Sequence, residues 1–80
     1  MRKSLGSPRH KALIGLLIAK REAAGLTQSD LASRLGQYQS FVARLAGGQR
    51  RVDVIELLDL ADVLKFDASK VLRKIHKELT

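Results

Sequence analysis

The sequence predicts an all-α domain of five short helices. Three observations predict this class: no stretch alternates apolar and polar residues as a strand would, apolar residues recur at helical spacing, and capping residues separate the apolar stretches. The 80 residues make one small domain, and 45% of them are hydrophobic, enough to bury a core. The absence of cysteine suits a reducing, cytoplasmic location.

The first helix is expected to begin at Pro8, because a proline at the start of a helix loses no hydrogen bond. Leu13, Leu17 and Ala24 then fall on one stripe. Gly25 ends this helix, since glycine takes the left-handed conformation readily. Residues 12–19 are apolar but too few to span a bilayer, which takes roughly 20 residues, so no membrane association is expected.

Four shorter helices follow. Thr27 is a good N-cap with Asp30 three residues later, so the second helix is expected over 28–35. The third begins near Gln39 and ends at residues 47–48, which are both glycine.

The remaining two helices are also placed by their caps. Asp53 opens the fourth, which runs to about Leu64, and Asp67 or Ser69 opens the fifth, which runs to about Leu79. Residues 1–8 are expected to form a flexible basic arm, and residues 9–80 a single domain.

The net charge of +7 is unevenly distributed along the chain. Residues 1–52 hold ten Lys or Arg and two acids, whereas residues 53–80 hold five and six. Such a chain either presents one electropositive face to a polyanion or merely has a solvated basic surface. The arrangement of the basic residues has to decide between the two.

The second and third predicted helices are joined by only a few residues, LGQY, with Gly36 at the corner and the small Ala32 where the helices cross. This is the spacing of a helix-turn-helix, which projects the first turn of its second helix outward. Gln39 and Ser40 lie in that turn, and Arg44 lies one turn later. Glutamine can bond adenine, arginine can bond guanine, and serine either base. The pattern predicts a surface that reads base edges in the major groove of double-stranded DNA.

The stretches LTQSDLASRLG, QSFVARL and GQRRVDVIEL resemble the Cro/C1-type (xenobiotic-response-element type) regulators, which include phage repressors and restriction-modification controllers. The resemblance covers about residues 11–73 and implies a five-helix Cro/C1 repressor-like DNA-binding domain, with the helix-turn-helix at its second and third helices. It implies base-reading roles for Gln37, Gln39, Ser40 and Arg44, and phosphate-binding roles for Thr27, Gln28, Tyr38, Phe41, Gln49, Arg50 and Arg51.

Several positions depart from the family pattern or keep two interpretations. The family commonly has Glu where this chain has Ala46, paired with an arginine that matches Arg21, so Arg21 is expected to reach solvent, the helix C-terminus or phosphate. Tyr38 either reaches a phosphate with its hydroxyl or is a partly exposed packing residue. Phe41 either touches a thymine methyl or packs beside the backbone, and Lys65 stands where relatives often have glycine.

The fourth helix has a wider apolar surface than one core requires, which favours a homodimer. Leu72 is expected to fill the core and to leave a spare apolar stripe on the fifth helix. The two recognition helices of the dimer would lie about 34 Å apart on a pseudo-palindromic site. The alternative is a monomer with exposed aliphatic side chains. The residues expected in the interface are Leu57, Leu60, Val71, Ile75 and Leu79.

No catalytic or metal site is predicted, and no cofactor. His10 and His76 lie near opposite ends without a ligand cluster, and Ser40 has no general base beside it. The predicted function is a sequence-specific transcriptional regulator, either a repressor or an autoregulating controller. The alternative is an antitoxin or another protein-interaction module that binds a regulatory partner protein and its own promoter.

Overall fold

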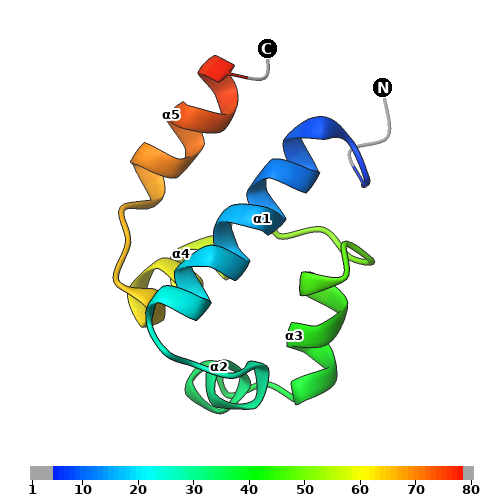
Figure 1. Cartoon of the computed structure of the whole chain (residues 1–80), viewed down its shortest axis with the longest axis vertical. Helices are drawn as coiled ribbons and strands as arrows, with labels where there is room; N and C mark the ends of the chain where they lie inside the picture. Colours follow the sequence, from blue (N-terminus) through cyan, green and yellow to red (C-terminus); the bar gives the residue numbers. More distant parts are fainter. Residues whose placement is uncertain (1–4, 79–80) are drawn as a thin grey trace.

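A computed structural model describes residues 5–78, and all regular structure in this range is helical (Figure 1). The predicted all-α class is therefore confirmed. Residues 1–4 of the predicted arm and Leu79 lie outside the described residues. The helices are α1 (Pro8–Ala23), α2 (Gln28–Leu35), α3 (Gln39–Ala46), α4 (Val54–Leu64) and α5 (Ala68–Glu78).

Both ends of α1 follow from local chemistry. The hydroxyl of Ser7 accepts a hydrogen bond from the first turn, and Pro8 is the first helical residue. The helix thus begins at the residue expected from the sequence. At the other end Gly25 has φ 72°, and the N–H of Leu26 donates to the carbonyl of Arg21 at 3.2 Å.

The caps of α2 are also those predicted. The Thr27 hydroxyl accepts from the Asp30 N–H at 3.0 Å, and the Asp30 carboxylate accepts from the Thr27 N–H at 2.9 Å. The bond from the Thr27 backbone, followed by the one with its hydroxyl, holds the pKa of Asp30 below its ordinary value. Gly36, at φ 67°, ends the helix and turns the chain towards α3.

The helices pack around one core (Figure 1). α1 contacts α3 and α5, α2 contacts α3 and α4, and α4 contacts α5. α2 and α3 thereby form one end of the domain, and α5 lies at the other. Among the described residues no helix is both long and apolar enough to cross a membrane. The central cluster consists of Ile14, Leu17, Leu31, Ala32, Val42, Leu45, Leu57, Leu60 and Leu64.

The predicted orientation of the fifth helix is wrong. Val71 and Ile75 are 7% and 9% exposed, whereas Leu72, which was expected in the core, is 50% exposed. The stripe formed by residues 71 and 75 faces inward because α5 packs against α1 and α4. These two side chains are therefore not available as a dimer interface.

Two more of the predicted interface residues lie in the core. Leu57 and Leu60 belong to the central cluster, and Leu60 is only 1% exposed. The apolar side chains that α4 presents to solvent are instead Val54, Ile55 and Leu58. The wide apolar surface predicted for this helix exists, but it consists of different residues.

Candidate nucleic-acid interface

The exposed surface of α3 and of the corner before it carries the predicted base-reading residues. Val42 and Leu45 are buried and hold α3 against the core. The opposite side of the helix is consequently turned to solvent. The exposed residues are Gln39, Ser40 and Arg44 on this side of the helix and Gln37 in the corner before it. Glutamine, serine and arginine together on one protruding helix have the donors and acceptors that distinguish base pairs in a major groove.

The first residues of α2 and α3 are joined by their side chains. The amide nitrogen of Gln39 donates to the amide oxygen of Gln28 at 2.8 Å. The Gln39 amide keeps its oxygen and its second N–H, which are the groups that can pair with adenine. Gln28 keeps both of its N–H groups, which can donate to a phosphate. The bond therefore fixes the orientation of Gln39 without using the atoms that would read a base.

The residues for which phosphate contacts are predicted flank the corner, and several of them are exposed. Tyr38 precedes α3, makes no side-chain capping bond and is 83% exposed, which excludes the packing interpretation. The oxygen of the Thr27 hydroxyl is used by the cap of α2, and its O–H can still donate to a phosphate. Gln49 and Arg51 are exposed in the loop that follows α3.

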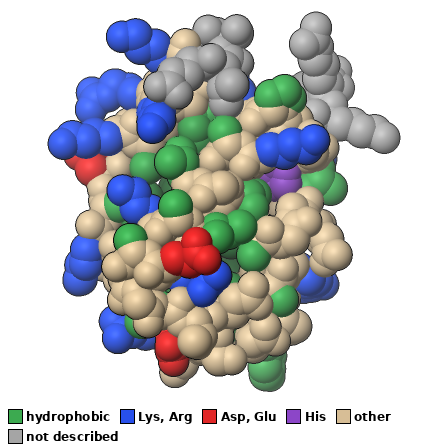
Figure 2. Space-filling view, viewed as in Figure 1, with side chains coloured by type: hydrophobic (Ala, Val, Ile, Leu, Met, Phe, Trp, Pro, Cys, Tyr) green, Lys and Arg blue, Asp and Glu red, His purple; other side chains and the backbone are tan. Residues whose placement is uncertain are grey.

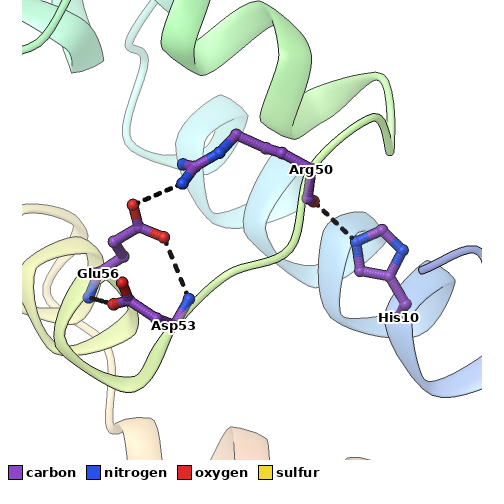
Figure 3. A network of polar contacts seen from close by, with 4 residues as sticks. All are labelled: His10, Arg50, Asp53 and Glu56. Atoms are coloured by element: carbon purple, nitrogen blue, oxygen red, sulfur yellow. Dashed lines mark hydrogen bonds and ion pairs between the residues drawn. The ribbon is translucent and has the colours of Figure 1, made fainter. Parts of the chain in front are cut away.

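The sequence predicts a phosphate contact for Arg50, whereas in the structure its side chain is only 28% exposed and has partners within the domain. Its guanidinium lies over the ring of Phe41, 4.3 Å from the centroid, and its Nη2 forms an ion pair with Glu56 at 2.8 Å (Figure 3). Its Nη1 is buried and has no hydrogen-bond partner among the described residues. The contact with the ring face offsets part of that loss. Arg50 thus joins α3, the loop after it and α4.

Phe41 is likewise a packing residue. It is half-buried, packs against the central cluster, and one face of its ring is covered by Arg50. Of the two interpretations of Phe41, a contact with a thymine methyl and packing beside the backbone, the half-buried position favours packing. Through Arg50, Phe41 is linked to the loop that carries Gln49 and Arg51.

The sequence predicts no role for His10, yet this histidine is only 9% exposed and has a backbone partner at each ring nitrogen. One partner is the N–H of Gly6 and the other is the carbonyl of Arg50 (Figure 3). The available signal was the Ser7 cap, which fixes the register of α1 and so points His10 inward.

Arg21 and Ala46 lie at the same small hollow in the core. The Nη1 of Arg21 donates to the carbonyl of Leu26 at 2.7 Å, just beyond the end of α1. This is the helix C-terminus interpretation among the three that the sequence left open. Because position 46 holds no carboxylate to pair with Arg21, this bond offsets part of the free energy lost when the guanidinium is partly buried.

Acidic and basic residues of the C-terminal part lie on different helices, which the charge count along the sequence does not show. Residues 53–80 are nearly balanced, but their acids lie mostly on α4 and its cap, and their bases mostly on α5. Figure 2 shows Lys and Arg side chains gathered over α5 and along that edge of the domain. The structure thus also exposes basic side chains on α5, at the opposite end of the domain from α2 and α3.

Comparison with known proteins agrees with this geometry. A helix-turn-helix domain family model matches residues 15–73. An XRE-family like protein from Pseudomonas syringae pv. tomato is 42% identical, with a TM-score of 0.82 over 90% of this chain and 88% of that one. The chain belongs to the XRE-type helix-turn-helix family. As a member of that family it is a DNA-binding transcriptional regulator.

This XRE-type domain also shares its fold with a more distant protein. The clp gene regulator ClgR from C. glutamicum has a TM-score of 0.77 over 92% of this chain and 96% of that one, at 20% identity. A search among curated proteins finds no match. The five helices and their order are thus those of XRE-type proteins.

Proposed function

We propose that this regulator binds a pseudo-palindromic operator as a homodimer and represses transcription by occupying a promoter. The observation that supports this most is the exposed row on α3 and its corner, in which Gln39 and Arg44 supply the two side chains best suited to adenine and guanine. Ser40 and Gln37 lie beside them on the same exposed stretch. These four residues would read bases.

Positioning on the duplex would come from residues that flank this row. Thr27, Gln28 and Tyr38 lie on one side of it along the chain, and Gln49 and Arg51 lie on the other. Contacts of this kind fix the register of a protein on DNA and carry no sequence information themselves. Arg50 and Phe41 would support the second group from within the domain.

The proposed dimer uses the apolar side chains that α4 and α5 leave in solvent. Val54 and Ile55 are 69% and 65% exposed, and Leu58 and Leu72 are 47% and 50% exposed. Large apolar side chains at this exposure on two neighbouring helices are typical of a surface that a partner covers. A two-fold axis through this face would set two α3 helices about one turn of DNA apart, roughly 34 Å.

Selection of binding sites from a random duplex library tests the proposal. We expect enrichment of a two-fold symmetric site whose affinity falls about a thousandfold between 50 and 200 mM salt, as for ~6 phosphate contacts. Recovery of unrelated sequences with the same affinity as the starting library would contradict sequence-specific regulation. Enrichment of a single asymmetric half-site would contradict the dimer alone.

A further inference from the structure

The imidazole of His10 connects two backbone segments that are far apart in the sequence. The Gly6 N–H donates to Nδ1 at 2.9 Å, and because a backbone N–H can only donate, Nδ1 carries no proton. Nε2 lies 3.0 Å from the carbonyl oxygen of Arg50 and must then be the N–H that donates to it. A neutral ring with its proton on Nε2 thus holds residue 6 and residue 50 together.

The chain around Arg50 is held from its other side as well. The Arg50 guanidinium contacts Phe41 of α3 and pairs with Glu56 of α4. Glu56 in turn accepts a hydrogen bond from the N–H of Asp53, and its own N–H donates to the Asp53 carboxylate (Figure 3). The side chain of Arg50 is therefore fixed by α3 and α4, and its backbone is fixed by α1.

The bond from His10 to the Arg50 carbonyl holds a loop that is entered through two glycines and that carries two exposed polar residues. Gly47 and Gly48 lead into the loop, and Gly48 has φ 73°. Two successive glycines leave this entry with more conformational freedom than other residues would. The Arg50 carbonyl belongs to the peptide unit that Arg50 shares with Arg51, so its anchoring restricts Arg51 directly. Gln49 is the residue before Arg50 and is restricted through it.

We propose that His10 is a positioning residue for DNA binding: by holding the Arg50 carbonyl it sets the loop in which Gln49 and Arg51 meet phosphates. The proposal rests on the proposed DNA-binding function of this surface. Because His10 is buried, it would act through the loop and not by contact with DNA. Its effect is to lower the conformational entropy that the loop would otherwise lose on binding.

Two substitutions separate the two bonds of the ring. In His10→Gln the side-chain nitrogen reaches the place of Nε2 and can donate to Arg50, whereas the acceptor for Gly6 is lost. In His10→Asn the side-chain oxygen takes the place of Nδ1 and accepts from Gly6, whereas the donor to Arg50 is lost. His10→Phe keeps the shape of the ring and neither bond. Amide hydrogen exchange of Gly6 in the free protein reports whether each variant keeps the bond from Gly6.

We expect His10→Asn and His10→Phe to weaken binding roughly three- to tenfold, the value of one lost hydrogen bond, on operator and random duplex alike. Their salt dependence should become shallower by about one phosphate contact. His10→Gln should bind as the wild type does, within about twofold. Each of these two variants loses one hydrogen bond, so the melting temperatures of His10→Gln and His10→Asn should fall by similar amounts. A merely structural role of His10 would then give the two variants the same DNA affinity.

Equal DNA affinities for His10→Gln and His10→Asn would overturn the positioning role, whether both are weakened or neither is. This comparison holds even where His10→Phe fails to fold. A wild-type protein that binds no duplex would overturn both the positioning role and the proposed function. A wild-type protein that binds while all variants match it would overturn the positioning role alone.

Discussion

The side-chain amide of Gln39 donates a hydrogen bond to the side chain of Gln28 at 2.8 Å, which joins the first residue of α3 to the first residue of α2. A glutamine at the tip of a recognition helix is otherwise mobile and loses rotamer entropy when it meets a base. The bond restricts Gln39 before DNA arrives. The two residues should therefore act as one unit in binding.

A double-mutant cycle with Gln28→Ala and Gln39→Ala tests this coupling. We expect Gln39→Ala to cost about 1–3 kcal/mol at one base pair, and the double variant to cost at least ~0.5 kcal/mol less than the sum of the single ones. Fluorescence anisotropy with a labelled operator measures all four affinities. Gln39→Ala combined with Ser33→Ala, an exposed change elsewhere on α2, should be additive. Additivity in both cycles would contradict the coupling.

Arg50→Ala should mainly lower the stability of the domain, whereas Arg51→Ala should mainly lower the salt dependence of DNA binding. Arg50→Ala removes the ring contact and a partly exposed ion pair, so the free energy of unfolding should fall by about 1–2 kcal/mol. Arg51 is exposed, so Arg51→Ala should cost less stability than Arg50→Ala, and it should lower the salt slope of DNA binding by about 1. Urea denaturation and salt titrations measure the two effects. An Arg50→Ala variant of unchanged stability and reduced salt slope would restore Arg50 as a phosphate contact.

Ala46→Glu should stabilise the domain. Arg21 and Ala46 line the same hollow, so a carboxylate at position 46 can pair with the guanidinium, which already bonds the Leu26 carbonyl. A gain of about 1 kcal/mol would raise the melting temperature by roughly 4–8 °C. Ala46→Gln, which adds the same bulk without the charge, is the control and should raise it less. A melting temperature of Ala46→Glu at or below that of the wild type would reject the pairing.

Leu72→Glu should dissociate the dimer without unfolding the protein. Leu72 is half exposed, so a charge there costs little in the monomer but is desolvated in the proposed interface. Val71→Glu is the matched control, because it places the same charge in the core and should unfold the domain. Sedimentation equilibrium and circular dichroism follow the two properties. A Leu72→Glu protein that remains dimeric would place the interface elsewhere.

The caps made most of the fold predictable from sequence. Thr27 with Asp30, Gly36 and Asp53 each act within a few residues of the chain, and each ends or begins a helix where expected. Even Lys65, which was noted because relatives often have glycine there, has φ 59°, a conformation that glycine adopts more easily. Contacts between residues this close along the chain can be predicted from the sequence alone.

The errors concern contacts between distant segments. On α5 the apolar spacing of residues 71 and 75 was visible, but whether that stripe faced the core or solvent depended on how α5 meets α1. Similarly, the charge pattern located a basic cluster after α3 without showing which arginine Glu56 would hold. His10 bonds a residue 40 positions away, and no local pattern marks such a partner.

Methylation interference on the selected operator tests the central claim most directly, namely that the exposed row of α3 reads bases in the major groove. We expect methylation of guanine N7, a major-groove acceptor that Arg44 would contact, to block binding at symmetric positions about one helical turn apart. Arg44→Ala should lose this interference, and methylation of adenine N3 in the minor groove should not affect binding at those positions. Interference confined to adenine N3, or guanine interference that persists in Arg44→Ala, would contradict the claim.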